Sequence, residues 1–266
     1  MPGIKIFYII WPLLLLLVAL FVFLERQTLG EWWWNTTNTL PEVVLFITQD
    51  PYLGVQMAEY YFDSPEENGF YNLDKSRRLY QTVIAMDETF VSPWYQLARI
   101  AFLYSDYEQS LQYIDIYQFL AEDPRPHSLY LEGLVLGFAG DTKASLRTLQ
   151  AYYIYDNSSW YIHNNLAWTY FKLGNFTAMD TVTDAGLEHH PHNPWLLMNK
   201  GLAQYNLGNQ EQALYFLDAS DRYARSLEPK DWSRTYPGND PAIAPVGLAE
   251  FRSILEANRK LIHKQR

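Results

Sequence analysis

The sequence predicts an all-α protein, a superhelix of about four to five helix pairs with a capping helix at its end and one transmembrane helix before it. Two sets of residues recur at steps of 34 positions. The first set consists of glycines followed by Asp or Asn, at Gly140-Asp141, Gly174-Asn175 and Gly208-Asn209. The second set consists of small residues, at Gly133, Ala167 and Gly201. A fixed period of this length is typical of chains that stack one helix-turn-helix unit on the next.

An apolar run follows a short N-terminal tail at 1–5. Residues 6–24 carry no charge, and at about 1.5 Å per residue such a helix spans roughly 28 Å, enough for a bilayer core. The alternative is a cleavable signal peptide, but no Ala-x-Ala-like site follows in the segment Glu25–Gly30. We therefore expect a retained, single-pass membrane anchor.

The side of the membrane depends on few charges. Lys5 and the amino terminus precede the anchor and Arg26 follows it, so the positive-inside comparison is nearly tied. A very short tail before an anchor commonly stays in the cytoplasm, which predicts that the repeats are extracytoplasmic. The chain has no cysteine, which fits either side.

Residues 25–50 are expected to form a juxtamembrane linker, with the polar stretch 35–39 as a tether. Three consecutive indoles lie in this linker, at Trp32, Trp33 and Trp34. Indoles favour the headgroup zone of a bilayer, where the ring is half wet. The alternative is that they pack on the first helices of the superhelix.

Residues 51–228 are predicted to carry the helix pairs, as a degenerate repeat at 51–90 and repeats at 91–125, 126–159, 160–193 and 194–228. The small residue of each first helix sits where the two helices cross. The turn glycine adopts the left-handed conformation that ends a helix, and the Asp or Asn after it caps the next helix. Ser105 stands at the turn position of repeat 91–125, which makes that turn a weaker match.

A Pro/Gly-rich connection at 229–245 leads to a capping helix at 246–266. Trp232 and Tyr236 in the connection either anchor a loop folded back onto the concave face or belong to a turn that positions the capping helix. The capping helix carries five cations, which fit its C-terminal dipole and could alternatively contact lipid or a partner: Arg252, Arg259, Lys260, Lys264 and Arg266.

The segment from Trp160 to Asn193 reads W-Y-I-H-N-N-L-A-W-T-Y-F-K-L-G-N-F-T-A-M and continues to G-L-E-H-H-P. It resembles a tetratricopeptide repeat (TPR), with matching residues at Leu166, Ala167, Tyr170, Gly174, Phe176, Gly186 and Pro191. The resemblance extends over about 52–227, most clearly from Val91 onward. It implies an all-α, right-handed superhelix in a membrane-anchored, bacterial-type TPR protein whose role is protein–protein interaction.

Composition and motifs argue against other classes of function. The chain has 20 basic and 30 acidic side chains, a formal net charge of −10, which disfavours sequence-independent nucleic-acid binding. Gly133 and Gly137 are four positions apart, whereas the first two glycines of a dinucleotide-binding loop are two apart, and the repeat already accounts for Gly133 and Gly140. His189, His190 and His192 are weak candidates for a metal site, with a solvated loop as the better interpretation. We expect no enzyme activity, no cofactor and no small-molecule substrate.

In a superhelix of this kind the outward positions of each first helix line a concave face. These positions are rich in Tyr, Trp and Asn, which suit an extended or helical peptide: Tyr95, Arg99, Tyr130, Leu134, Phe138, Tyr161, Asn164, Asn165, Trp168, Met198, Asn199, Leu202 and Tyr205. The alternative is that several of them pack between repeats. The sequence thus predicts a membrane-anchored adaptor that binds a partner's peptide segment in this groove. A structural subunit of a larger membrane or envelope complex, using the convex face or the capping helix, is the alternative.

Overall fold

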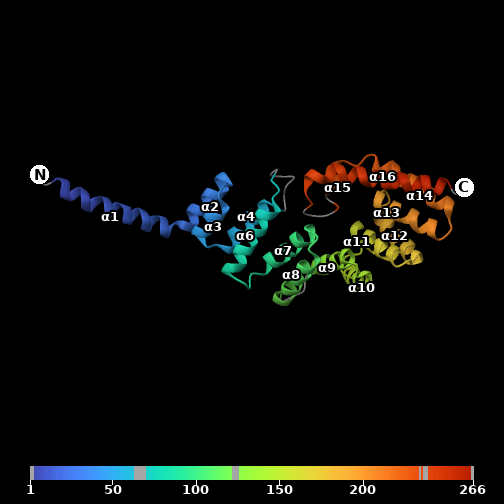
Figure 1. Ribbon diagram of the computed structural model, residues 1–266, viewed down its shortest axis with the longest axis horizontal. Coiled ribbons are helices and arrows are strands. Elements are labelled where there is room, and N and C mark those ends of the chain that lie inside the picture. Colours follow the sequence, from blue (N-terminus) through green and yellow to red (C-terminus); the bar gives the residue numbers. More distant parts are fainter. Residues whose placement is uncertain (1–2, 63–69, 122–125, 234, 236–238, 265–266) are drawn as a thin grey trace.

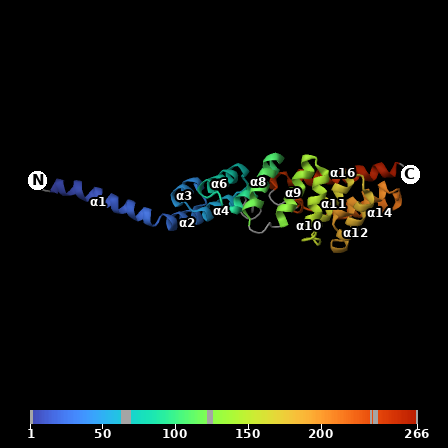
Figure 2. The ribbon, with the colours of Figure 1, turned by 90° about the horizontal axis from the view of Figure 1, so that it is seen from below.

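The computed structural model describes residues 3–62, 70–121, 126–233, 235 and 239–264, with backbone only for 3–10 and 127. Within these residues every regular element is a helix. Figures 1 and 2 show an elongated molecule in which α1 (Gly3–Leu24) projects from one end of a row of packed helices. The last helix, α16 (Ala244–His263), lies at the other end. Residues 64–69, which the sequence predicts to be a loop between the two helices of the degenerate repeat, lie outside the described residues.

The N-terminal helix α1 is 22 residues long and contains Pro12. Its described side chains, from Trp11 to Leu24, are all exposed. In the described part of the chain, which includes α1 side chains only from Trp11, no single helix combines the length and apolarity needed to cross a membrane. The helices Trp11–Leu24 and Arg26–Thr37 together have the required length and apolarity, but they are bent by 72° relative to each other.

The segment expected as a linker at 25–50 instead forms two helices, α2 (Arg26–Thr37) and α3 (Pro41–Thr48). They cross at Gly30, where a Cβ atom would meet the Thr48 side chain at 2.2 Å. Trp34 is only 2% exposed and its ring meets the edge of Tyr60 at 5.3 Å between centroids. The linker expectation failed because this packing, which leaves no periodic signature, stabilises the hairpin.

The three indoles of this segment divide between the two expected roles. Trp34 is buried in the core cluster of the first helix pairs, as the packing alternative requires. Trp32 and Trp33 remain 61% and 41% exposed.

Five helix pairs follow, each an antiparallel hairpin stacked on the next. They are α4 (Pro51–Tyr60) with α6 (Leu73–Met86), α7 (Val91–Leu103) with α8 (Tyr107–Leu120), α9 (Pro126–Ala139) with α10 (Thr142–Tyr153), α11 (Trp160–Lys172) with α12 (Phe176–His189), and α13 (Pro194–Asn206) with α14 (Gln210–Ala224). Figure 1 shows α7, α9, α11 and α13 facing the C-terminal segment, with α8, α10 and α12 on the opposite side. We call the side formed by α7, α9, α11 and α13 the inner face.

The turns between paired helices use the predicted left-handed backbone. Gly140, Gly174 and Gly208 have φ values of 98°, 69° and 86°, and Ser105 takes the same conformation at 61°. Asp106, Asp141 and Asn175 each accept a hydrogen bond from the backbone N–H three residues later, as expected of N-caps.

Asn209, in contrast, makes no such cap. Its Nδ2 donates to Oε1 of Gln204 at 2.8 Å instead. The cap predicted for α14 is therefore wrong, and the Asn209 side chain bonds to Gln204 of the previous helix instead.

The small residues of the first helices lie at the helix crossings, as predicted. A Cβ on Gly133 would lie 2.6 Å from a methyl carbon of Leu149, and one on Gly201 would lie 2.7 Å from Cγ of Leu217. The close approach also brings hydroxyls of the second helix to carbonyls of the first. Ser145 Oγ donates to the Gly133 carbonyl at 2.7 Å, and Ser110 Oγ donates to the Ala98 carbonyl at 2.8 Å.

The C-terminal region contains α15 (Pro229–Ser233), a short 3-10 helix η1 (Pro241–Ile243) and then α16. Arg259 of α16 donates to carboxylates of Asp218 and Asp221 on α14 at 2.7 and 3.0 Å. Trp232 packs on Gly247 so closely that a Cβ there would overlap the indole. The connection therefore contains helical turns and holds α16 in place, while Tyr236 lies outside the described residues.

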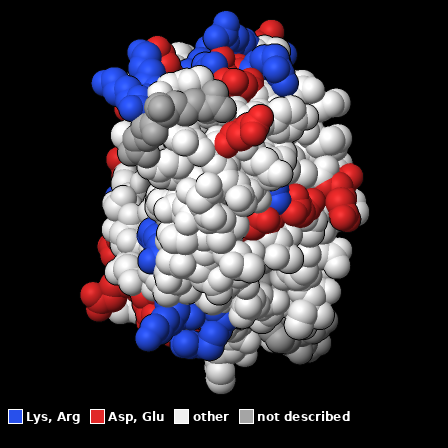
Figure 3. Space-filling model, turned by 90° about the vertical axis from the view of Figure 1, so that its right-hand side faces the viewer, with Lys and Arg blue, Asp and Glu red and all other residues white. Residues whose placement is uncertain are grey.

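Arg252 plays a related part at the end of α14. Its guanidinium donates to the carbonyls of Ala224 and Leu227 at 3.0 and 2.8 Å. Such a cation satisfies carbonyls that the helix end leaves without intrahelical donors. Figure 3 views this C-terminal end of the molecule, where most of the visible surface is uncharged and Lys and Arg gather at its upper and lower edges.

Candidate functional site

The predicted groove residues all lie on α7, α9, α11 and α13, but their exposure differs. Leu134 and Asn199 are buried, whereas Trp168 and Phe138 are about half exposed. The others are partly buried: Tyr95, Arg99, Tyr130, Tyr161, Asn164, Asn165, Met198, Leu202 and Tyr205. The inner face therefore combines residues that pack between repeats with a smaller set open to solvent.

Two Asn side chains connect successive first helices with the same offset. Asn165 Nδ2 donates to the Tyr130 hydroxyl at 2.8 Å, and Asn199 Nδ2 donates to Oδ1 of Asn164 at 2.9 Å. Each bond joins residues 35 positions apart. Asn165 also donates to the Tyr161 carbonyl at 2.8 Å. These amides therefore hold neighbouring repeats in register.

A cluster of three tyrosines and one carboxylate lies at the junction of α9, α10 and α11. The Tyr130 ring lies 5.2 and 5.0 Å from the rings of Tyr152 and Tyr161. Asp156 accepts the Tyr161 hydroxyl at 2.8 Å and the backbone N–H of Ser159 at 3.0 Å. The cluster fixes the start of α11 relative to the preceding repeat.

The ionisation of this cluster follows from its surroundings. Burial opposes the charge of Asp156, but hydrogen bonds from Ser159, Tyr161 and Ser158 outweigh it and hold the pKa of this carboxyl well below its usual range. Burial raises the pKa of Tyr152, and bonding to Tyr161 raises it further. Asp156 stays an acceptor and Tyr152 stays protonated near neutral pH. Sequence reasoning missed Asp156, although Asp followed by Asn157-Ser158-Ser159 is a turn signal, and its carboxylate accepts the backbone N–H groups of Ser158 and Ser159.

The open part of the inner face is centred on α9 and α11. Phe138 and Trp168 border a small cavity of about 30 Å³ between these helices. The Trp168 ring stacks on Phe171 with centroids 5.4 Å apart, and Phe102 meets the Phe138 ring edge-on at 5.3 Å. These aromatic rings are thus held by neighbours on one side and open to solvent on the other.

Lys172 adds a cation to this region. Its Nζ donates to the Gly137 carbonyl at 2.9 Å and lies 5.9 Å from the Trp168 ring centroid. The carbonyl lies on α9 and the lysine on α11, so this bond also spans two repeats. We call Phe138, Trp168 and Lys172 the central cluster.

At both ends of the inner face, candidate groove residues are engaged inside the protein. Arg99 Nη1 donates to Gln96 at 2.6 Å, and its guanidinium lies 4.5 Å from the Phe62 ring. Met198 and Tyr205 pack against the cluster of buried residues that α14 shares with α16. The structure thus brings the predicted residues onto one face, with the solvent-open aromatic surface near its middle.

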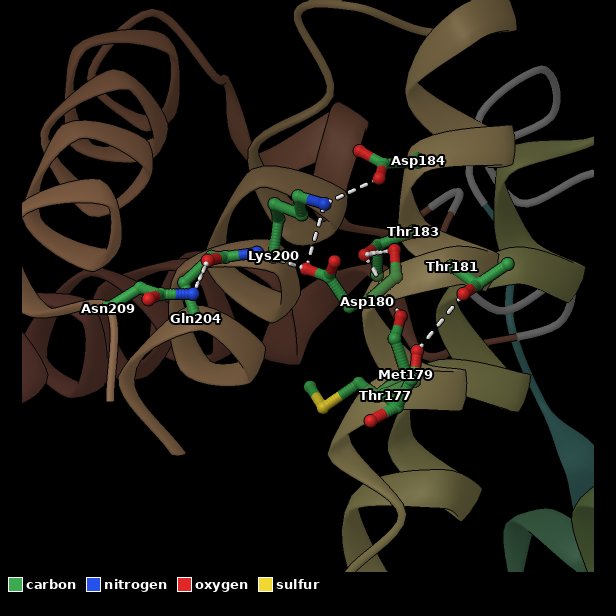
Figure 4. A network of polar contacts seen from close by, with 9 residues as sticks. All are labelled: Thr177, Met179, Asp180, Thr181, Thr183, Asp184, Lys200, Gln204 and Asn209. Atoms are coloured by element: carbon green, nitrogen blue, oxygen red, sulfur yellow. Dashed lines mark hydrogen bonds and ion pairs between the residues drawn. The ribbon is translucent and has the colours of Figure 1, made fainter. Parts of the chain in front are cut away.

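A second feature lies on the opposite side, around α12, α13 and α14. Figure 4 shows buried Lys200 between Asp180 and Asp184, with N–O distances of 2.7 and 2.6 Å. Gln204 donates to Asp180 at 2.6 Å and accepts from Asn209, which extends the network to the next turn. The network joins α12 to α13 through charge-assisted bonds.

A hollow of about 590 Å³ lies beside this network. Its lining includes the carboxylates of Asp184 and Glu188 and the aromatic rings of Tyr215, Phe216 and Tyr223. Its volume falls in the range of ligand-binding clefts. Sequence reasoning did not identify this hollow, because its walls combine side chains of α12, α13 and α14 that only the packing of these helices brings together.

The histidine cluster has other contacts. His190 Nε2 lies 2.8 Å from the Ser158 carbonyl, and the His192 ring lies tilted against the Tyr223 ring with 4.6 Å between centroids. Among the residues that the structure describes, no three His, Cys, Asp or Glu side chains are grouped so that they could hold a metal ion.

No protein-family model and no curated protein sequence matches the chain. Solved structures do match its fold. A structure titled as YrrB, "a TPR protein with an unusual peptide-binding site", aligns with a TM-score of 0.55 at 15% identity, over 70% of this chain and 92% of that one. MamA from residue 41 onward, from Desulfovibrio magneticus RS-1, aligns with a TM-score of 0.58 at 13% identity, over 67% and 97%. The helix pairs of this chain therefore have the tetratricopeptide-repeat fold.

Proposed function

We propose that the protein is a membrane-anchored scaffold that binds a peptide segment of a partner protein on its inner face. The observation that carries the proposal is the central cluster, where Phe138 and Trp168 keep large apolar surfaces open to solvent on two adjacent first helices. Rigid aromatic side chains of this kind supply much of the binding energy in protein interfaces. The likeness to YrrB supports it, since that title describes peptide binding by a TPR protein.

The chemistry of the cluster indicates which peptides fit. Phe138 and Trp168 offer apolar surface beside a cavity of about 30 Å³, which is too small for a large side chain without some opening. Lys172 places a cation next to the indole. A segment with a small or flat apolar side chain near a carboxylate would contact both. The peptide would lie across α9 and α11.

Membrane anchoring is the second part of the proposal. At about 1.5 Å per residue, the 22 residues of α1 extend about 33 Å, comparable to the apolar thickness of a bilayer. Its described side chains are exposed and apolar. With the short N-terminal tail in the cytoplasm, the repeats would be extracytoplasmic.

The test is photo-crosslinking in cells with the full-length protein. A photoreactive residue replaces Trp168 in one variant and Tyr215, exposed on α14, in another. We expect a discrete protein adduct from position 168 and a weaker one or none from position 215. The reverse pattern would overturn binding at the inner face. Trp168→Ala, which removes an exposed ring, should reduce the adduct formed from a probe at position 138.

A second candidate function is that of a structural subunit in a larger complex. The hollow of about 590 Å³ on the α12–α14 side favours it, because exposed Tyr215 and half-buried Tyr223 line it together with Asp184. A stable contact there would give adducts from position 215 and migration above monomer mass after gentle detergent extraction. Adducts confined to position 168 would argue against this role.

A further inference from the structure

The hairpin α2–α3 has one packed side and one open apolar side. Trp34 and Leu45 are buried, Trp34 against Tyr60 and Leu45 against Gly54 of α4. The open side carries seven exposed apolar residues, which we call the hairpin patch: Leu29, Trp32, Trp33, Leu40, Val43, Phe46 and Ile47. Apolar surface gathered in this way is rare on soluble monomers and marks a contact site for protein or membrane.

The hairpin patch continues directly into α1. A hollow of about 290 Å³ joins the three helices, with Val22 from α1, Leu29 and Trp33 from α2, and Val43 and Ile47 from α3 in its wall. Arg26 is the one charged residue in that wall. Its guanidinium lies 5.0 Å from the ring of Phe23, at the border between the apolar helix and the hairpin. A long cationic side chain at this border can reach the headgroups while its stem stays in apolar surroundings.

The angle between the helices determines where the hairpin patch would lie on a bilayer. The helix from Trp11 to Leu24 and α2 are bent by 72° relative to each other. If α1 runs close to the membrane normal, α2 runs close to the membrane plane. Amphipathic helices that bind membrane surfaces adopt this orientation, and exposed Trp32 and Trp33 then lie at headgroup level.

Charge distinguishes the kind of lipid surface. Residues 25–50 contain four carboxylates, at Glu25, Glu31, Glu42 and Asp50, against the single cation Arg26. This balance gives no attraction to anionic headgroups, which favour clusters of Lys and Arg. Binding of the hairpin patch must therefore come from burial of apolar surface. The occupant that fits is a bilayer with neutral headgroups.

We propose that the hairpin patch inserts into the headgroup zone of the bilayer that α1 crosses. The hairpin α2–α3 then rests on the membrane instead of forming a loose linker between the anchor and the repeats. The proposal depends on the proposed function only for the placement of α1. It assigns a second membrane contact, separate from the anchor and made by α2 and α3.

Depth measurements on spin labels test this proposal. The chain has no cysteine, so single cysteines can carry a nitroxide at chosen sites. Leu17→Cys reports on α1, and Phe46→Cys reports on the hairpin patch. Phe119→Cys on α8 is the matched control, because Phe119 and Phe46 are both phenylalanines with 86% and 76% exposure. Each full-length variant is reconstituted in phosphatidylcholine vesicles, and its relaxation by dissolved oxygen and by a water-soluble nickel complex is compared.

We expect the labels at positions 17 and 46 to collide more with oxygen, and the label at 119 to collide more with nickel. The depth at position 46 should not change between low and high salt, because the contact is apolar. A label at 46 that behaves like the label at 119 overturns the proposal. If the label at position 17 is in lipid and the label at position 46 is in water, the anchor by α1 stands and the hairpin contact is rejected. A label at 46 shielded from both probes would also reject it, in favour of a protein or a second copy as occupant.

Position 17 tests the anchor separately. A water-exposed label there would overturn membrane anchoring by α1, whatever the label at 46 shows. A lipid-exposed label at 46 in that case would still support the hairpin contact. The two proposals therefore fail by different observations.

Discussion

Asn199 on α13 donates a hydrogen bond of 2.9 Å to Asn164 on α11. The two residues lie 35 positions apart, one more than the 34-residue period. Asn165 and Tyr130 form the same kind of bond between α11 and α9. In both bonds the donor belongs to the later repeat and the acceptor to the earlier one. The bonds therefore link three consecutive first helices along the inner face.

Removing one partner of the Asn pair should be costly. Asn199 is buried, so Asn199→Ala leaves Asn164 without this donor and should lower the free energy of unfolding by about 1–2 kcal/mol. Urea unfolding of Asn199→Ala, Asn164→Ala and the double variant gives the coupling, expected at about 0.5–1.5 kcal/mol. Asn206→Ala, at an exposed position of α13, serves as the control. Strict additivity of the two single changes would contradict a direct interaction.

The left-handed turn at Ser105 predicts a gain in stability. A non-glycine residue in this conformation costs about 1 kcal/mol, so Ser105→Gly should raise the free energy of unfolding by about 0.5–1 kcal/mol. Gly140 occupies the equivalent turn of the next repeat, and a Cβ there would meet no atom within 4 Å. Gly140→Ser should therefore lower stability through the backbone alone. Midpoints of urea unfolding that move in the same direction for both variants would refute this account.

The lowered pKa of Asp156 predicts a pH dependence of stability. A carboxyl whose folded pKa lies below its unfolded value stabilises the fold above the unfolded pKa, near 3.9, and this contribution is lost as the pH falls through the folded pKa. Asp156→Asn should lower the free energy of unfolding by about 1–3 kcal/mol at pH 7. The difference from the wild type should shrink below about pH 4.

Thermal unfolding between pH 3 and pH 7 measures this difference. Asp115→Asn, on an exposed position of α8, is the control and should show a small and nearly constant effect. If Asp156→Asn lowers stability by the same amount across the whole pH range, the ionised form of the Asp156 carboxyl stabilises the fold no more than its neutral form does.

The buried cation of α13 predicts an ordered set of effects. Lys200→Met leaves Asp180 and Asp184 without their shared partner and should lower the free energy of unfolding by about 2–4 kcal/mol. Asp184→Asn should cost less, because that carboxylate is mostly exposed. Lys143→Met, on the exposed side of α10, should have little effect. Chemical denaturation of the three variants checks the order, and an equal effect of Lys200→Met and Lys143→Met would contradict it.

The part of the fold that sequence could predict is the part governed by backbone geometry. Gly140, Gly174 and Gly208 mark turns because only a residue that tolerates positive φ suits that position. Gly133 and Gly201 mark crossings because a Cβ would overlap Leu149 or Leu217. Both constraints act on single residues, so they recur visibly along the chain.

The features that sequence did not predict depend on tertiary partners. The α2–α3 hairpin is held by Trp34 against Tyr60, a contact that leaves no periodic trace. The period indicates which residues lie on the first helices, but it does not tell which side chains bond to one another. Asn165 and Asn199 illustrate this, since their partners lie one helix pair away.

Helices α1 and α16 lie at opposite ends of the long axis of the molecule (Figures 1 and 2). On a membrane held by α1, the order of the helix pairs in the sequence becomes their order of height above the lipid. Helix pairs α2–α3 and α4–α6 would then act as a pedestal below the central cluster. Inserting or deleting one such pair would change the distance between the central cluster and the membrane without altering the residues of the cluster. That distance would then select partners by the length of their tails.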